Sequence, residues 1–233
     1  MSGAAEDDRL RLWGWVGLLA QLIFVVSWLI AGFWQGQNYS TLAHTISDMY
    51  AITAPHGWFL VITITLAGAG TIAFAWLGLR VALRRGTSGR GRLATTVAIL
   101  LSLSILGLGE LLTPMEREAC RVADPGCSPA DQLGSLGSRM DAVLSTAGLL
   151  ILVATGFVLA AAMRRSPAWT SWAWPTRWAT IVIIVLLVVT GAASAGLGGL
   201  FERLLAAAAA GGVAALAVHV IRIAQDLTAT TNR

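Results

Sequence analysis

The sequence predicts an all-α protein, a polytopic integral membrane six-helix bundle with both termini in the cytoplasm. Three observations lead to this prediction. The 233-residue chain is 56% hydrophobic and 12% charged, whereas a typical soluble domain has roughly a quarter of its residues charged. Six separate stretches are each apolar for about 20 residues, the length that spans a bilayer as a helix. The arginines gather on one side of those stretches. A soluble enzyme is therefore excluded.

The predicted elements follow one another closely along the chain. They are a cytoplasmic tail at 1–11, spans at 12–33, 59–83, 93–112, 142–163, 179–197 and 204–223, and a cytoplasmic tail at 224–233. The first stretch is longer than the apolar core of a signal peptide, so we expect it to remain as a helix. The first two outer loops are long, and long loops in a compact protein tend to carry function.

The orientation follows from the charged residues. The chain has 16 arginines and no lysine. With the N-terminus inside, the cytoplasmic segments hold twelve arginines and four acids (net +8), and the outer segments hold four arginines and eight acids (net −4). This asymmetry is typical of the positive-inside rule. It assigns the arginines to lipid headgroups rather than to nucleic acid. Arginine without lysine, beside many alanines and glycines, suggests a bacterial genome, and hence the bacterial inner membrane.

The first outer loop carries several side chains that could take part in catalysis or binding. Ser40 is a plausible N-cap for a short helix, on which His44 and Asp48 would share one face. A carboxylate beside an imidazole raises the basicity of the ring and orients it, as in a general base. Tyr39 and His56 of the same loop are candidate binding residues. The alternative is that these side chains only cap and solvate an interfacial loop.

Glu110 ends the third predicted span. A carboxylate inside a membrane helix costs roughly 2.5–3.5 kcal/mol on insertion scales, so it normally faces a partner or a polar cavity. A dehydrated carboxyl there could serve as a proton donor. The alternative is a boundary glutamate that reaches headgroup water.

Further charged residues lie on the same outer side. Arg139 and Asp141 enter the fourth span, and Glu202 precedes Arg203 at the last outer turn. Together with the loop residues and Glu110, they could form one polar cluster that binds a headgroup or diphosphate through Arg139, or that acts on a lipid through paired acids. The alternative is an Arg139–acid salt bridge that ties the loops together.

The two cysteines, Cys120 and Cys127, lie on the outer side, where disulfides form readily. We expect a structural disulfide, because a zinc site needs more ligands than two cysteines. His219 has no second intramembrane histidine at a similar depth, which argues against a b-type cytochrome. The sequence predicts no metal and no cofactor, and it lacks phosphate-binding loops and hydrolase elbows.

Several motifs resemble a known family. They are 38–42 with 46–48 after the first span, 78–80 at the exit of the second, and 199–204 before the last. The chain resembles the bacterial membrane family catalogued as domain of unknown function 998, over nearly its whole length. The resemblance implies six spans and leaves the activity open. That family's fourth span often opens with a histidine, whereas Ser138-Arg139-Met140-Asp141 stands here.

Two hypotheses of function follow. The first is an integral membrane enzyme that acts on a lipid or isoprenoid substrate by carboxylate acid/base chemistry, either cyclisation or hydrolysis. Glu110, Asp48, His44, Asp141 and Glu202 are its candidate catalytic residues. The alternative is a non-catalytic membrane scaffold, lipid-organising factor or small transporter subunit, with membrane lipids as partners in either case.

Overall fold

The computed structural model describes residues 2–85, 91–192 and 196–231, and in these residues the chain forms helices and turns without a strand. Parts of four predicted segments lie outside the described residues: residue 1 of the N-terminal tail, 86–90 of the inner connection, 193–195 of the fifth span, and 232–233 of the C-terminal tail.

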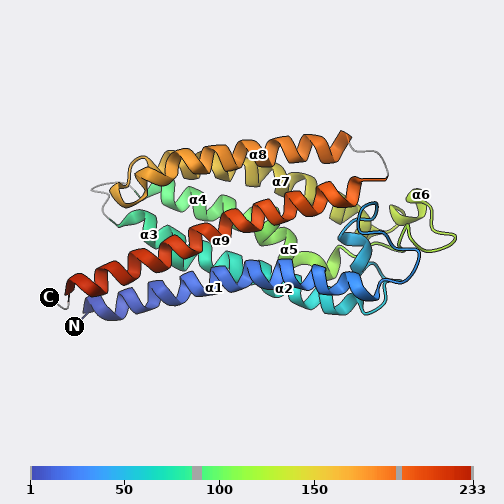
Figure 1. Ribbon diagram of the computed structural model, residues 1–233, viewed down its shortest axis with the longest axis horizontal. Coiled ribbons are helices and arrows are strands. Elements are labelled where there is room, and N and C mark those ends of the chain that lie inside the picture. The colour runs from blue at the N-terminus through green and yellow to red at the C-terminus, as the bar shows by residue number, and fades with distance from the viewer. Residues whose placement is uncertain (1, 86–90, 193–195, 232–233) are drawn as a thin grey trace.

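The long helices run side by side along the long axis of the molecule (Figure 1). They are α1 (Ser2–Ala31), α2 (Gly57–Ala73), α4 (Arg92–Leu103), α7 (Leu136–Met163), α8 (Ala173–Ala192) and α9 (Gly198–Thr231), and α2 continues through η3 (Phe74–Leu79) and α3 (Arg80–Arg84). Both termini lie at one end, and the long connections lie at the other (Figure 1).

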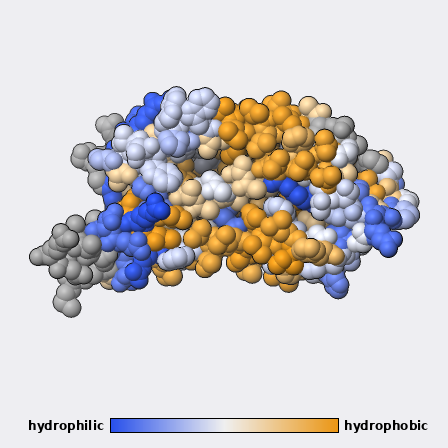
Figure 2. Space-filling model, in the orientation of Figure 1, coloured by the Kyte–Doolittle hydropathy of each residue, from blue (hydrophilic) through white to orange (hydrophobic). Residues whose placement is uncertain are grey.

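Five of these helical segments are long and apolar enough to cross a membrane. The bent pair Arg92–Leu103 and Ile105–Met115 makes a sixth when it is counted as one span. Figure 2 shows a mainly hydrophobic middle of the molecule with hydrophilic residues at its two ends. Leu22 and Val26 of α1 and Val185 and Val188 of α8 are among the large hydrophobic side chains that are exposed. The chain is therefore a multi-pass membrane protein with an all-α fold, as predicted.

The bundle core lies between α1, α2 and α9, because α1 packs chiefly against α9 and α2. A second group forms where α7 packs against α4 and α8. Helix α8 contacts mainly α7 and α9 and is the least buried of the candidate spans. It therefore lies at the periphery of the bundle.

The third span is broken rather than continuous. Helix α4 ends at Leu103, Ser104 is extended (φ −70°, ψ 172°), and the chain resumes as η4 (Ile105–Gly109) and α5 (Glu110–Leu112), bent by 46°. The Leu101 carbonyl accepts from the Ser104 hydroxyl at 2.8 Å and from Ser104 N–H at 3.3 Å, so this acceptor is satisfied at the break. The break sets the direction in which Glu110 enters the bundle.

The expected helix from Ser40 does not form, so that prediction was wrong. The only helical element of this region is the short 3-10 helix η2 (Ser47–Tyr50). The backbone of the preceding residues is instead bonded to the start of α9: Leu200 N–H donates to the Leu42 carbonyl, and the carboxylate of Glu202 accepts from Ile46 N–H. These tertiary partners replace the hydrogen bonds that a local helix would make.

Candidate functional site

A cavity of about 380 Å³ lies at the end of the bundle that carries the long loops. Its apolar walls come from α1, α2, η4, α7, α8 and α9, through residues such as Phe24, Ile64, Leu149 and Leu205. Five carboxyl groups also line it: Glu110, Glu116, Glu118, Asp141 and Glu202. Among the described residues that line this acid cavity, none is Arg, Lys or His. The site combines hydrophobic walls with an excess of acids.

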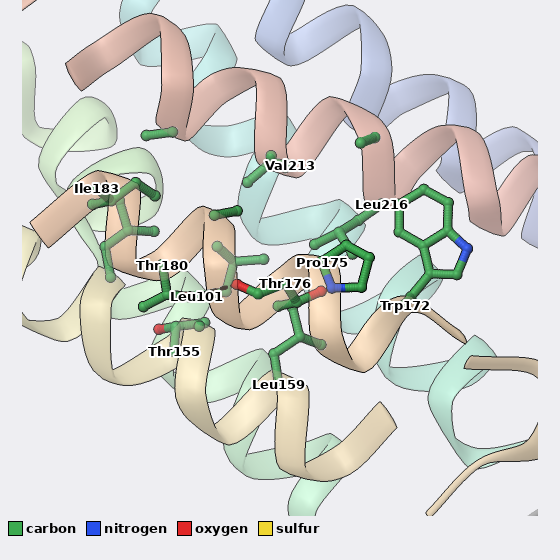
Figure 3. A pocket seen from close by; sticks show the side chains of 16 residues that line it. Leu101, Thr155, Leu159, Trp172, Pro175, Thr176, Thr180, Ile183, Val213 and Leu216 are labelled. Atoms are coloured by element: carbon green, nitrogen blue, oxygen red, sulfur yellow. Dashed lines mark hydrogen bonds between the residues drawn. The ribbon is translucent and has the colours of Figure 1, made fainter. Parts of the chain in front are cut away.

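A second cavity of about 210 Å³ lies between α7, α8 and α9 (Figure 3). Its lining is almost wholly apolar and includes Leu152, Leu159, Ile183 and Val213.

Three of the predicted catalytic residues, Glu110, Asp141 and Glu202, meet in the acid cavity although they come from three different spans. Sequence analysis did not single out Glu116 and Glu118, which also line it. Both follow the short 3-10 helix η5 (Thr113–Met115) directly after the third span. Their position at the end of a span that already carries Glu110 was the signal that could have identified them.

Glu110 is the first residue of α5 and is 4% exposed. Neither of its carboxyl oxygens has a hydrogen-bond partner in the described part of the chain. Its backbone is packed against α2: a Cβ added to Gly68 would lie 2.5 Å from Leu111 N and 2.9 Å from the carbonyl carbon of Glu110. The close approach at Gly68 therefore holds a bare carboxyl at the wall of the cavity.

Glu116 and Glu118 are both buried. Burial raises the pKa of each to about 8, and the charge of Asp141 adds to the effect. Glu118 accepts hydrogen bonds from the Ser47 hydroxyl at 3.1 Å and from the side-chain amide of Gln132 at 2.8 Å. At neutral pH these two groups are therefore largely protonated and able to give a proton.

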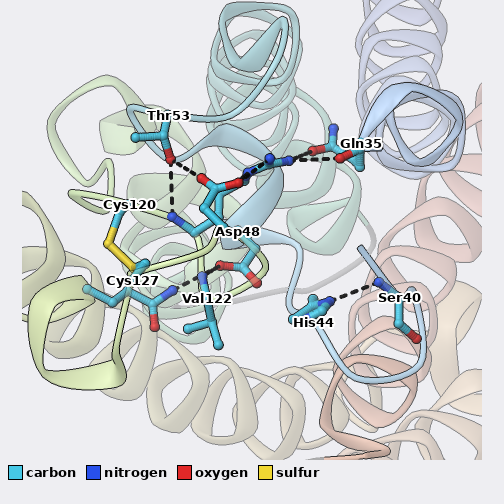
Figure 4. A network of polar contacts seen from close by, with 11 residues as sticks. Gln35, Ser40, His44, Asp48, Thr53, Cys120, Val122 and Cys127 are labelled. Carbon is cyan, nitrogen blue, oxygen red and sulfur yellow. Dashed lines mark hydrogen bonds and ion pairs between the residues drawn. A yellow bond between two sulfur atoms is a disulfide. The ribbon is translucent and has the colours of Figure 1, made fainter. Parts of the chain in front are cut away.

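Asp48 lies beside the acid cavity and does not line it. Its carboxylate accepts from Val122 N–H at 3.1 Å and from the Gln132 amide at 3.0 Å (Figure 4). The same Gln132 amide donates to Glu118, so it links the two acids. Burial is the main cause of the raised pKa of Asp48. Gln132 itself, from the short helix α6 (Pro129–Gln132), was not anticipated from the sequence.

His44 does not line the cavity either. Its Nδ1 accepts a hydrogen bond from Ser40 N–H at 2.9 Å, and its ring packs against that of Tyr39. Without the predicted helix, His44 and Asp48 share no helical face. The histidine is close enough for its charge to act on Asp48, and a catalytic role for it stays a prediction.

The three predicted binding residues lie around the outside of the cavity. Tyr39 donates to the Thr45 carbonyl at 3.1 Å, and burial raises its pKa to about 12. His56 is exposed, has a left-handed backbone (φ 54°) and meets Trp34 edge-on. Arg139 is exposed. The buried arginine of this end is instead Arg203, which donates to the carbonyls of Thr41, His44 and Gly199 and to the Tyr39 hydroxyl.

Cys120 and Cys127 are joined by a disulfide, with their Cα atoms 6.1 Å apart. The bond closes the loop that presents Val122 N–H to Asp48 (Figure 4). In the same loop, Asp124 pairs with Arg121 and accepts from the Thr53 hydroxyl at 2.6 Å. The disulfide therefore supports the geometry beside the cavity.

The described residues contain no group of three or more His, Cys, Asp or Glu side chains that could hold a metal ion. The five carboxyls that line the acid cavity are therefore considered for proton transfer and for binding of a polar group.

Comparison with known proteins bears on the family alone. Neither the curated proteins nor the solved structures yield a match. A family model described as "Protein of unknown function (DUF998)" matches residues 18–219, most of the chain. The chain therefore belongs to the DUF998 family.

Proposed function

We propose that this protein is an integral membrane enzyme that binds a lipid or isoprenoid in the acid cavity and transforms it by carboxylate acid/base chemistry. The observation that carries the proposal is Glu110, a buried carboxyl at the wall of a mostly apolar cavity. Neither of its oxygens has a hydrogen-bond partner among the residues that the structure describes. An unsatisfied buried polar group is costly and is common where function requires it. Its natural partner is a molecule that enters the cavity.

The lining also indicates which polar end the substrate carries. Among the described residues that line the acid cavity, no cation is present to neutralise a buried phosphate or another anionic headgroup, and any carboxylate among the lining acids adds repulsion. A neutral or cationic polar end is compatible with them. This argues for a hydroxyl, amine, ester or alkene at the reacting end, and against the diphosphate considered from the sequence.

The acids of the cavity can supply both the proton donor and the proton acceptor that such a reaction needs. In a cyclisation, Glu110 donates a proton to a double bond, and a carboxylate such as Glu202 or Asp141 removes one from the resulting cation, so that no proton is consumed overall. In a hydrolysis, the acid protonates the leaving oxygen while a carboxylate accepts a proton from water. The buried Glu116 and Glu118, with pKa values of about 8, can return a proton to the site.

The test is an untargeted lipid profile of a bacterial host that expresses the protein. The wild type should convert a host lipid or a supplied isoprenoid alcohol, and Glu110→Gln should reduce the product at least tenfold at equal expression. Asp8 is an exposed carboxylate near the N-terminal end of α1, and Asp8→Asn should keep the wild-type level of product. An unchanged product in Glu110→Gln would contradict the role of this residue.

A second candidate, a non-catalytic scaffold or transporter subunit, is favoured by the contacts of the other acids. Glu202 binds Ile46 N–H and Asp48 binds Val122 N–H, which are contacts that hold loops. Under this hypothesis, Asp48→Asn lowers stability, and the amount of each lipid is the same in the wild type and in the Asp48→Asn and Glu110→Gln variants.

A further inference from the structure

The second cavity continues the acid cavity. Ala209 of α9 lines both. On the three helices that line both cavities, lining residues recur at spacings of three or four: 202, 205, 209, 212 and 216 on α9, 145, 149, 152, 156 and 159 on α7, and 183, 187 and 190 on α8. Because residues three and four apart share a helix face, the two cavities lie end to end along one three-helix seam.

The seam has open space at Gly212, and one of its helices has few buried residues. Gly212 lines the second cavity, and a Cβ added there would meet nothing within 4 Å. Only 11% of the most apolar window of α8 is buried, against 44% for α9. Helix α8 can therefore admit a molecule from the lipid at a small cost in lost packing.

The threonine hydroxyls that line the second cavity already have partners within the described part of the chain. The hydroxyls of Thr155 and Thr180 donate to the carbonyls of Ile151 and Thr176 in their own helices, at 2.7 and 2.8 Å. The Thr176 hydroxyl is directed to Met163 Sδ at 3.2 Å. The remaining lining is mostly apolar and includes Leu101, Leu159, Trp172 and Leu216 (Figure 3). The cavity suits a hydrocarbon chain and not a second polar ligand.

We propose that the seam between α7, α8 and α9 binds the apolar tail of the molecule whose polar end lies among the carboxyls, and that Gly212 sets the tail length accepted. The inference rests on the proposed function for the position of the polar end. From Glu202 to Leu216 the seam rises through fourteen steps along α9, about 21 Å at the rise of an α-helix. The substrate is thus a long-chain amphiphile with a neutral or cationic end.

Binding of alkylamines tests this in the purified protein in nanodiscs. A photoactivatable long-chain amine with its diazirine near the tail end is cross-linked, mapped by peptide mass spectrometry, and competed with amines of short and long chain. The wild type should carry the label on α8 and α9 around Gly212, and long-chain amines should compete far better than short ones.

Gly212→Trp should weaken the binding of the long-chain amine by about tenfold or more, because two or more of its methylenes can no longer be buried. It should leave the short-chain amine unchanged. If Gly212→Trp disturbs folding, Gly212→Leu tests the same point with a smaller side chain and should also weaken binding of the long-chain amine. Gly211→Trp is the matched control, because Gly211 is exposed on the same helix.

The outcomes separate the two proposals. If Gly212→Trp and Gly212→Leu leave the chain-length preference intact, or if the label maps outside α7, α8 and α9, the tail site is overturned. If Glu110→Gln weakens amines of both lengths equally, the tail site stands and the carboxyl is the anchor of the head. If Glu110→Gln changes neither while the length preference persists, the proposed role of Glu110 fails and the tail site survives.

Discussion

Arg203 joins the start of α9 to the first outer loop through one buried guanidinium. Nη1 donates to the carbonyls of Thr41, His44 and Gly199 at 2.7–2.9 Å, and Nη2 donates to the Tyr39 hydroxyl. Its neighbour Glu202 accepts from Ile46 N–H of the same loop. Two consecutive residues of opposite charge therefore hold the loop over the acid cavity. Both Arg139 and Arg203 are predicted on the outer side, and the predicted binding residue is Arg139, because the sequence does not show which arginine is buried.

Arg203→Met should destabilise the protein strongly. It leaves several carbonyl acceptors without a donor, and each unsatisfied buried group costs about 1–3 kcal/mol. We expect a lower Tm in detergent, and faster proteolysis of the 39–50 loop. Arg139→Met, at an exposed position, should match the wild type. Equal Tm values for the two variants would contradict the bracing role of Arg203.

The stability of the protein should fall as the pH rises. The pKa of Glu118 is about 8 in the folded protein, against an ordinary value of 4.5, chiefly because of burial. Between these values the folded state holds a proton that the unfolded chain releases, so stability is highest below about pH 5 and declines through pH 8. Tm should drop by several degrees between pH 5 and pH 9, and Glu118→Gln should flatten this decline. Asp8→Asn should keep the wild-type slope, and a flat wild-type profile would refute the argument.

At the scale of elements, the broken third span decides where the chemistry lies. Composition predicts a span at 93–112, and the glycines around Glu110 suggest only close packing. The structure breaks this span at Ser104, and Ile105 approaches Gly148 of α7 so closely that an added Cβ would lie 2.7 Å from Ile105 N. The helix that resumes after the break packs against Gly68 of α2 through the backbone of Glu110 and Leu111. A break of this kind depends on what neighbouring helices leave room for, which no pattern within 93–112 contains.

Alanine at Gly68 or Gly148 should therefore displace the segment that carries Glu110. An added methyl group at either position must push against backbone atoms. We expect each variant to lower Tm by several degrees, the size of effect that overpacking of about 1–3 kcal/mol produces. Gly211→Ala should be neutral or slightly stabilising, since nothing lies near its added Cβ and alanine favours the helix. Three equal Tm values would show that the close approach is not tight.

At the scale of the whole molecule, the two ends of the bundle differ in charge and in content. One end holds both termini (Figure 1), and the other holds the disulfide and the acid cavity. The positive-inside rule predicts that the terminal end faces the cytoplasm, with a net charge of +8 against −4 outside.

This orientation can be checked in intact cells. A fluorescent protein fused to the C-terminus should fluoresce, since it folds in the cytoplasm. After mild reduction, a membrane-impermeant maleimide should label Cys120 and Cys127 in spheroplasts without lysis. Labelling that requires lysis would place the acid cavity at the cytoplasmic side and reverse the predicted topology.

The sequence by itself determined that this chain is a helical multi-pass membrane protein, because partition into lipid depends on the length and apolarity of each segment taken alone. It also identified Glu110 as a costly charge within a span, and Asp141 and Glu202 as candidate members of a polar cluster on the outer side. Only the tertiary structure decided that these acids share a cavity with Glu116 and Glu118, that Asp48 and His44 lie beside it, and that an apolar seam continues it between α7, α8 and α9. Residues from 110 to 202 meet through helix packing and a break at Ser104, and both depend on contacts between segments far apart in the chain.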